Sequence, residues 1–431
     1  MKIKFTKNGL RGTLTVPGDK SISHRAVILA ALASGRTEIQ GFLRGEDCLN
    51  TLKNFKMMGV EYKENKDKLI IQGKGLQGLK KPGKALDVGN SGTAFRLMAG
   101  VLAGQEFITK LTGDASIQRR PMKRVTDPLR KMGGRFSGDT APLIIFPSKL
   151  KGAAYESPVA SAQVKSALLL AGLYAKGVTS VTEPVLSRDH TERMLKNFGV
   201  KLRTENLTSG KYKAVLAGGV TKLQGGLKIN IPGDFSSAAF FIVGALILPG
   251  SKLLLKNVGV NPTRIGLLEA LKKMGAKITL KNKRLFSGEP VADIEVVSSA
   301  LQGVEVGGEL LVRMIDEVPI FAVAAALAKG RTVIKNAEEL RVKESDRIKA
   351  VVEMLKAFGL KAAETSDGLL IDGNPQVLDK LARINTYHDH RIAMSAAILG
   401  LLNKKETSIT DDKCIDTSFP NFAVLLKEAG K

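Results

Sequence analysis

The segment Val16-Pro17-Gly18-Asp19-Lys20-Ser21 returns half a chain later as Ile231-Pro232-Gly233-Asp234-Phe235-Ser236. Pro-Gly-Asp favours a turn, and in both copies an apolar run follows it. The first copy continues with the cations Lys20 and Arg25, whereas the second has phenylalanines at the matching positions. A repeated scaffold with cations on one side predicts two similar lobes that enclose an anionic ligand.

The chain contains six units of one pattern: an apolar helix, a strand, an amphipathic helix that ends at a glycine, and two more strands. The apolar helices are expected at 22–33, 92–103, 162–175, 236–247, 319–328 and 390–402. The glycines that end the second helices, where a left-handed residue is common, are Gly59, Gly133, Gly199, Gly275, Gly359 and Gly430. Because the first helices are apolar on nearly every face, they should be buried. The expected fold class is α/β: a two-domain inside-out α/β barrel of six βαββαβ-like repeats, three per domain.

The sixth unit lacks its last strands, while the first 18 residues hold two spare ones, at Lys2–Lys7 and Gly12–Val16. We expect these two strands to supply the missing pair. The expected boundaries are 1–18 plus 233–431 for a discontinuous C-terminal lobe, 19–232 for an N-terminal lobe, and a hinge near 18–20 and 231–234.

Length and composition limit the class of protein. A chain of 431 residues suits two domains, and the longest apolar stretch, Ala238–Leu248, is shorter than the roughly 18 residues of a membrane span. Cys48 and Cys414 form neither a disulfide framework nor a metal-binding spacing. We therefore expect a cytoplasmic protein with reduced thiols and no membrane partner.

The net charge of +25 is the compositional outlier. A basic nucleic-acid-binding scaffold is one interpretation. However, the lysines are spread along the chain, and five tyrosines without tryptophan offer few platforms on which bases could stack. Small anionic substrates are the favoured partners, and nucleic acid remains the alternative from another functional class.

In the first half, cations and small polar residues gather at expected helix starts. Ser21 or Asp19 can cap the first helix, and Arg25 lies on the same face as Ser21. The free N–H groups of a helix start suit a phosphate. The further candidates are Gly89-Asn90-Ser91-Gly92 with Arg96, Arg119-Arg120 with Lys123 and Arg124, and Ser161-Ala162-Gln163.

The second half combines carboxylates with cations. Asp316 precedes an apolar helix, so it is either a cap or a reactive acid. Lys343 and Arg347 would share one face if this segment is helical, with Glu344 beside them to move protons. Asp346 could neutralise this pair. The last candidates are His388-Asp389-His390-Arg391 and Lys413, and two imidazoles at i and i+2 diverge too far to favour a metal.

Together these segments resemble the 5-enolpyruvylshikimate-3-phosphate synthases along the whole chain. The resemblance rests on five motifs in order: Val-Pro-Gly-Asp-Lys-Ser-Ile-Ser-His-Arg (16–25), Gly-Asn-Ser-Gly-Thr-Ala-Phe-Arg (89–96), Arg-Arg-Pro-Met (119–122), Arg-Val-Lys-Glu-Ser-Asp-Arg (341–347) and Asp-His-Arg (389–391). It implies transfer of the enolpyruvyl group of phosphoenolpyruvate to the 5-hydroxyl of shikimate 3-phosphate through a tetrahedral intermediate. It also implies that no metal or organic cofactor is needed, and we expect a monomer.

The resemblance also implies a set of site residues. Those expected to bind shikimate 3-phosphate are Lys20, Ser21, Arg25, Ser161, Ala162, Gln163, Arg188, Asp316 and Lys343. Those expected to bind phosphoenolpyruvate are Lys20, Asn90, Gly92, Arg120, Gln163, Arg347, Arg391 and Lys413. Asp316 would accept the proton of the 5-hydroxyl and Glu344, with Lys413 nearby, would protonate the methylene carbon, while Lys20 and Lys343 compete for these roles. Ala162 stands where many relatives have a second serine.

The nearest rival is the related enzyme that transfers enolpyruvyl to UDP-N-acetylglucosamine. That enzyme uses a cysteine on a mobile loop, and Ala115 occupies the comparable position here. The rival is therefore disfavoured. Gly92 leaves room beside the expected phosphoenolpyruvate site, so we expect sensitivity to the phosphonate glyphosate, tempered because Leu97 replaces a family proline.

Overall fold

The computed structural model describes residues 1–65 and 67–430, and these form two compact units. The N-terminal unit contains Gly18–Ile231 together with Leu285–Glu289. The C-terminal unit contains Met1–Pro17, Pro232–Arg284 and the described residues from Pro290 onwards. The chain therefore passes between the units at both Pro-Gly-Asp segments and on both sides of one hairpin tip. Lys431, the last residue of the expected C-terminal lobe, lies outside the described residues.

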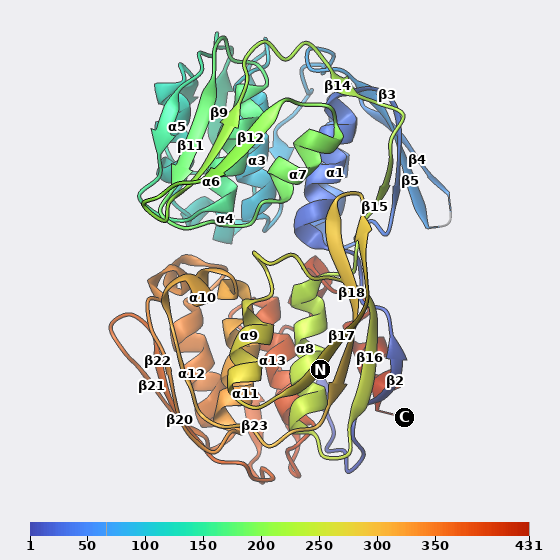
Figure 1. Cartoon of the computed structure of the whole chain (residues 1–431), viewed down its shortest axis with the longest axis vertical. Coiled ribbons are helices and arrows are strands. Elements are labelled where there is room, and N and C mark those ends of the chain that lie inside the picture. Colours follow the sequence, from blue (N-terminus) through green and yellow to red (C-terminus); the bar gives the residue numbers. More distant parts are fainter. Residues whose placement is uncertain (66, 431) are drawn as a thin grey trace. The chain divides into compact units, whose positions relative to one another are not determined.

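Each unit has helices at its centre and strands on its outside (Figure 1). In the N-terminal unit, α1 (Lys20–Leu32), α3 (Gly92–Leu102) and α6 (Ala162–Gly172) are the apolar first helices. In the C-terminal unit the first helices are α8 (Phe235–Ile247), α11 (Val318–Ala326) and α13 (His390–Gly400). Most of their residues are buried, because apolar side chains occur on every face. The expected positions and burial of all six are confirmed.

The second helix of each repeat exposes part of its surface. These helices are α2 (Glu46–Met57), α5 (Lys123–Lys131), α7 (His190–Asn197), α9 (Gly266–Lys273), α12 (Arg347–Ala357) and α14 (Phe422–Ala429). The glycine that follows is left-handed in five of them, with φ from 78° to 94°. Gly430 has a φ of −90°, so its predicted left-handed conformation is wrong. Short helical turns add α4 (Ala115–Arg119), α10 (Gly308–Val312), η1 (Ile315–Glu317), η2 (Glu338–Val342) and η3 (Asp412–Thr417).

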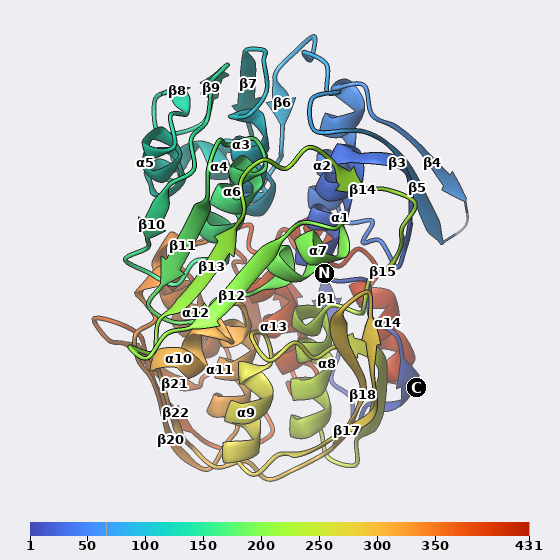
Figure 2. The same cartoon turned by 45° about the horizontal axis from the view of Figure 1, so that its top comes forward.

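The N-terminal unit contains three separate sheets (Figure 2). One has β14 (Leu223–Gln224) and β15 (Lys228–Asn230) beside β3 (Ala33–Gln40), followed by β5 (Lys68–Lys74) and β4 (Glu61–Asn65). The others run β6 (Leu86–Asp87), β7 (Thr109–Thr112), β9 (Leu143–Phe146), β8 (Arg135–Ser137), and β10 (Ala154–Glu156), β11 (Thr179–Glu183), β13 (Tyr212–Leu216), β12 (Leu202–Asn206). Each sheet contains three antiparallel strands of one repeat, and the first of them pairs in parallel with a strand that ends another repeat. For the first repeat, these parallel partners are β14 and β15, which end the third repeat.

The C-terminal unit repeats this arrangement with the help of two short strands from the N-terminal segment of the chain. Its sheets run β2 (Arg11–Leu14), β16 (Lys252–Gly259), β18 (Glu289–Val297), β17 (Lys277–Phe286), then β19 (Glu305–Val306), β20 (Gly330–Ile334), β22 (Leu369–Gly373), β21 (Lys361–Glu364), and β23 (Ala382–Ile384), β24 (Thr407–Ile409), β1 (Lys2–Ile3). Strand β1 pairs antiparallel with β24 of the sixth repeat, and β2 pairs in parallel with β16 of the fourth. The strands that end other repeats, such as β10 and β23, also pair in parallel with the first strand of another repeat, so the prediction that the two spare strands supply the missing pair is confirmed. None of the sheets in the described chain closes into a barrel.

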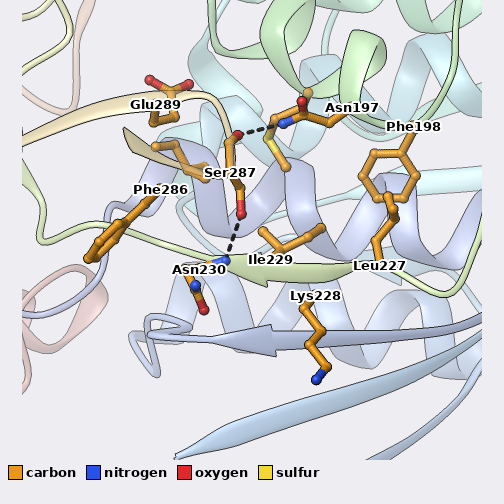
Figure 3. A pocket seen from close by; sticks show the side chains of 11 residues that line it. Asn197, Phe198, Leu227, Lys228, Ile229, Asn230, Phe286, Ser287 and Glu289 are labelled. Atoms are coloured by element: carbon orange, nitrogen blue, oxygen red, sulfur yellow. Dashed lines mark hydrogen bonds between the residues drawn. The ribbon is translucent and has the colours of Figure 1, made fainter. Parts of the chain in front are cut away.

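The tip of the β17–β18 hairpin is part of the N-terminal unit. Ser287 Oγ accepts a hydrogen bond from the backbone N–H of Asn230 at 2.9 Å, and its carbonyl accepts one from Asn197 (Figure 3). Arg193 donates to the carbonyl of Gly288 at 3.1 Å, and Glu289 lies 2.8 Å from Nδ1 of His190. These contacts fasten the tip to α7 and β15, an attachment that the sequence pattern did not predict.

Among the described residues no helix combines the length and apolar character that crossing a membrane requires.

Candidate active site

Two predicted site residues, Lys20 and Ser21, are the first residues of α1. Asp19 caps the helix, since its Oδ1 accepts the N–H of Ile22 at 2.8 Å, and this settles the choice between Asp19 and Ser21. Lys20 Nζ lies 2.6 Å from Oδ2 of Asp47, with 18% of its side chain exposed. Asp47 comes from α2, and nothing in the sequence pattern had connected it to Lys20.

Arg25 is buried and bound to other parts of the protein. Its Nε donates to Thr191 at 2.6 Å, its Nη2 to Ser166 at 2.8 Å and its Nη1 to the Ser21 carbonyl at 2.9 Å. Burial lowers its pKa to about 10, with Glu192 the largest opposing influence. Arg25 thus joins α1 to α6 and α7 while it holds the helix start in place.

His24 is a further organising residue of this region that the sequence reasoning missed. Its Nδ1 lies 2.8 Å from the hydroxyl of Thr51 and its Nε2 lies 3.3 Å from the hydroxyl of Ser91, which caps α3. Burial lowers the pKa of His24 well below its usual value, and Lys20 and Arg25 lower it further. A neutral imidazole therefore connects the starts of two candidate helices.

The start of α3 lies beside Arg120. Nη2 of Arg120 donates to Asn90 at 3.2 Å and to Ser116 at 3.1 Å. The buried Nε of Arg120 has no hydrogen-bond partner within the described chain. A Cβ added at Gly92 would lie 2.9 Å from Nη1 of Arg120 and 3.0 Å from Nη1 of Arg96. The glycine therefore leaves space that these two guanidinium groups border.

The start of α6 brings the third group of predicted residues to α3. Ser161 caps α6 with an Oγ that accepts the N–H of Val164 at 3.4 Å. Gln163 donates to Thr93 at 3.0 Å and accepts a hydrogen bond from Arg96. The first turns of α3 and α6 are consequently held together, with Ala162 partly exposed between Ser161 and Gln163. Arg188 is also partly exposed, two residues before α7.

Arg347 is the centre of the C-terminal set. Its side chain is 1% exposed and lies 2.6 Å from Glu344, 2.8 Å from Asp389 and 3.4 Å from Asp316. Burial alone would lower its pKa, but the three carboxylates, Asp389 foremost, raise the pKa above its usual value. A guanidinium that remains charged inside the protein can hold several acids in fixed positions.

The segment before α12 differs from the predicted helix. Lys343 lies between η2 and α12 with a φ of −84° and a ψ of −149°, and α12 begins only at Arg347. The expectation that Lys343 and Arg347 share a helical face is wrong, because Asp346 caps α12 between them. Asp346 pairs with Arg341 at 3.0 Å, so its expected role in neutralising the pair is wrong as well. Burial lowers the pKa of Lys343, which Arg347 reinforces and Asp316 opposes.

Asp316 is not the more buried acid of its segment. Its side chain is 16% exposed, whereas the neighbouring Glu317 is fully buried and accepts a hydrogen bond from Ser236. Asp316 lies in η1 and does not cap α11. Arg391 lies 3.9 Å from Asp316 and 3.8 Å from Glu317. Asp316 is therefore partly accessible between two arginines, Arg347 and Arg391.

Asp389 is the most important residue that the sequence interpretation left without a role. Its Oδ1 accepts the N–H of Arg391 and so caps α13, while its Oδ2 accepts Nε of Arg347 at 2.8 Å and the hydroxyl of Ser345 at 3.1 Å. An aspartate directly before an apolar helix is a capping signal, but its second partner is 42 residues away. Lys413 lies in η3 and is exposed.

The candidate residues thus form one set in each unit. The N-terminal set contains cations and neutral groups only: Lys20, Ser21, Arg25, Asn90, Gly92, Arg120, Ser161, Ala162, Gln163 and Arg188. The C-terminal set mixes cations with acids: Asp316, Lys343, Glu344, Arg347, Arg391 and Lys413. No group of three or more His, Cys, Asp or Glu side chains in the described chain could hold a metal ion.

A pocket of about 180 Å³ lies elsewhere in the N-terminal unit, beside the hairpin tip (Figure 3). Phe198, Leu227, Ile229 and Phe286 give it an apolar wall. None of the candidate site residues lines this pocket. It is therefore separate from the candidate active site.

Known proteins of one family match this protein along almost the whole chain. The family model described as EPSP synthase (3-phosphoshikimate 1-carboxyvinyltransferase) matches residues 5–426. Curated 3-phosphoshikimate 1-carboxyvinyltransferases of Brevibacillus brevis and Geobacter sulfurreducens are 53% and 52% identical, over 97% of this chain and 97% and 96% of theirs. The solved structure of EPSP synthase from Acinetobacter baumannii has a TM-score of 0.87 at 46% identity, and covers 100% of this chain and 98% of that one.

Proposed function

The chain belongs to the EPSP synthase family, and on this premise we propose which of its residues carry out the family's reaction. It is an enzyme that transfers the enolpyruvyl group of phosphoenolpyruvate to shikimate 3-phosphate, in the shikimate pathway of aromatic amino-acid biosynthesis. Transfer to UDP-N-acetylglucosamine and a nucleic-acid-binding scaffold are not favoured. The roles of the individual residues, described next, are the proposal.

The N-terminal set binds shikimate 3-phosphate in this proposal. This assignment is supported by the composition of the set, which combines helix starts with cations and contains no carboxylate. Ser161, Ala162 and Gln163 offer the free N–H groups and polar side chains of the α6 start to the phosphate, with Arg188 beside them. Lys20, Ser21 and Arg25 bind the same substrate from the start of α1. Arg120, Asn90 and Gly92, together with Lys20 and Gln163, contribute to phosphoenolpyruvate binding.

The C-terminal set supplies proton transfer and the remaining phosphoenolpyruvate contacts. The observation that carries this assignment is the position of Asp316 and Glu344, 3.4 Å and 2.6 Å from the buried Arg347. Arg347, Arg391 and Lys413 contribute positive charge for the carboxylate and phosphate of phosphoenolpyruvate. Lys343, whose pKa burial lowers, is suited to give and take a proton.

The proposed chemistry is an addition followed by an elimination. Asp316 accepts the proton of the 5-hydroxyl as that oxygen bonds to C2 of phosphoenolpyruvate, and Glu344 or Lys343 protonates C3 to give a tetrahedral intermediate. A proton then leaves C3 while phosphate departs from C2, which forms the enol ether. The protein needs no covalent adduct for these steps, and the arginines stabilise negative charge on the two substrates.

Phosphate release from shikimate 3-phosphate and phosphoenolpyruvate tests the activity, with UDP-N-acetylglucosamine as the competing acceptor. Ser161→Ala and Arg391→Gln test the division of labour. The first should raise the Kd for shikimate 3-phosphate and the second the KM for phosphoenolpyruvate, each by about tenfold or more. Equal effects of either variant on both substrates would contradict the assignment.

We also propose that the enzyme is a monomer and that it works in the cytoplasm, where the metabolites of the pathway are dissolved. Sedimentation equilibrium should give one chain mass. A stable dimer at micromolar concentration would refute the monomer.

A further inference from the structure

A buried ion cluster lies within the N-terminal unit, outside the residues that the sequence singled out. Lys165 Nζ, on α6, lies 2.7 Å from Oε2 of Glu183 and 2.9 Å from Oε1 of Glu192. The three side chains are 0%, 0% and 3% exposed. Buried ions of this kind rarely add stability over apolar residues of the same size, so a role in positioning other groups deserves a test.

Glu183 connects two segments that are distant in sequence. It is the last residue of β11, and its Oε1 accepts the backbone N–H of Ser161 at 2.7 Å. The same carboxylate accepts the hydroxyl of Ser187 at 2.7 and 2.8 Å. Ser161 caps α6, and Ser187 directly precedes Arg188. One acid therefore fixes the positions of both segments proposed to bind the phosphate of the substrate.

The charge of Glu183 would oppose phosphate binding if it were not balanced. Lys165 supplies the balancing charge: burial disfavours its ammonium, but Glu192 and Glu183 together raise its pKa. Burial raises the pKa of Glu192, an effect that Lys165 opposes. Lys165 also lies over the ring of Tyr212, 4.8 Å from its centre. The ammonium of Lys165 thus offsets the negative charge of Glu183 beside Ser161 and Ser187.

We propose that Glu183 is a positioning residue for the phosphate subsite of shikimate 3-phosphate. Its carboxylate holds the Ser161 cap and the Ser187–Arg188 segment in the arrangement that the phosphate requires, and Lys165 cancels its charge. The inference rests on the proposed function, because it takes Ser161 and Arg188 as phosphate ligands. Fixed ligands lose less freedom on binding, which is why positioning affects affinity.

Three variants separate this role from general support of the fold. Glu183→Ala removes the acceptor of both segments, but Lys165 keeps Glu192 as its partner, so the unit should still fold. Glu183→Gln keeps a carbonyl oxygen in the same place. Glu192→Gln is the matched control, because it removes a carboxylate from the same ammonium of Lys165. In the described chain Ser161 and Ser187 donate to Glu183 and not to Glu192.

Calorimetry with shikimate 3-phosphate and steady-state assays with varied phosphoenolpyruvate give the two readouts. Glu183→Ala should weaken shikimate 3-phosphate binding by about tenfold or more. The variant loses a charged acceptor for the N–H of Ser161 and for the N–H and hydroxyl of Ser187. The KM for phosphoenolpyruvate at saturating co-substrate should stay within about threefold. Glu183→Gln should restore most of the affinity, and Glu192→Gln should bind within about threefold of the parent enzyme.

The inference is overturned if Glu183→Ala binds shikimate 3-phosphate normally, if Glu192→Gln weakens binding equally, or if both substrates are affected alike. Ser161→Ala, measured in parallel, separates this result from failure of the proposed site. Weak binding by Ser161→Ala with normal binding by Glu183→Ala would refute only the positioning role. Normal binding by Ser161→Ala would refute the site assignment, and the inference with it.

Discussion

Nε of Arg347 lies 2.8 Å from Oδ2 of Asp389, and neither side chain is more than 1% exposed. The other oxygen of Asp389 caps α13 through the N–H of Arg391. A single carboxylate thus holds the guanidinium of Arg347 and the backbone of Arg391, the two arginines of the C-terminal set that are proposed to bind phosphoenolpyruvate. Although burial would raise the pKa of Asp389, Arg347 outweighs it and holds the pKa below its usual value.

Asp389→Asn should keep the cap but leave Arg347 without its closest buried counter-charge. We expect a loss of about 3–5 kcal/mol in the free energy of unfolding, measured with urea at pH 7. Asp346→Asn is the matched control, since Asp346 caps α12 at a 36% exposed site, and should cost less than about 1 kcal/mol. Equal losses would show that the buried pair has no special weight.

Lys20→Met should abolish turnover while the far-ultraviolet circular dichroism stays unchanged. Lys20 extends from the start of α1 and pairs with Asp47 at 2.6 Å, so its ammonium is held in a fixed place for an anionic substrate. We expect kcat to fall by about a hundredfold or more in a phosphate-release assay. Near-normal turnover would refute the catalytic assignment of Lys20.

Asp316→Ala should lower kcat by about a hundredfold or more, while the Kd for shikimate 3-phosphate changes much less. The reason is that Asp316 is proposed to accept a proton, and Arg347 retains Glu344 and Asp389 as partners in the variant. Single-turnover kinetics and calorimetry measure the two quantities. A binding defect without a loss of kcat would show that Asp316 is not the base.

Glyphosate should inhibit competitively with phosphoenolpyruvate, and Gly92→Ala should weaken that inhibition. An added methyl group would lie 2.9 Å from Arg120 and 3.0 Å from Arg96, so both guanidinium groups must shift. We expect the Ki of the variant to rise by about tenfold or more, with a smaller rise in the KM for phosphoenolpyruvate. A Ki for the parent enzyme in the millimolar range would contradict the expected sensitivity.

His24 should make the enzyme less stable in mild acid. Because burial lowers its pKa in the folded state, the unfolded chain binds a proton first as the pH falls. The contribution of His24 is therefore complete above about pH 6.5 and is lost as the pH falls from there toward the folded pKa. Urea unfolding of the parent and of His24→Gln at pH 7.5 and 5.5 measures this loss.

The free energy of unfolding should fall less between pH 7.5 and pH 5.5 in His24→Gln than in the parent. An unchanged slope in His24→Gln would show that His24 does not titrate on unfolding.

Local chemistry was readable along the chain. Buried apolar helices, caps such as Asp19 and turn-forming Pro-Gly-Asp segments depend on residues within a few positions of one another. The structure bears out the burial at all six first helices, and each of them except α11 begins with a side-chain cap. The exceptions are also local in origin. Asp346 caps the start of α12, so this helix begins at Arg347 and leaves Lys343 outside it, and Gly430 kept an ordinary right-handed conformation.

The residue types alone favoured a small anionic ligand, since cations and hydroxyls at helix starts suit phosphates wherever the chain places them, and the family resemblance supplied the two substrates. Which group each acid contacts was decided by tertiary structure. Asp47 beside Lys20, Asp389 beside Arg347 and Glu183 beside Ser161 are separated by 27, 42 and 22 residues. A single sequence does not encode such pairs as a pattern, because their energy depends on burial and distance, and both arise only when the helices and sheets have packed.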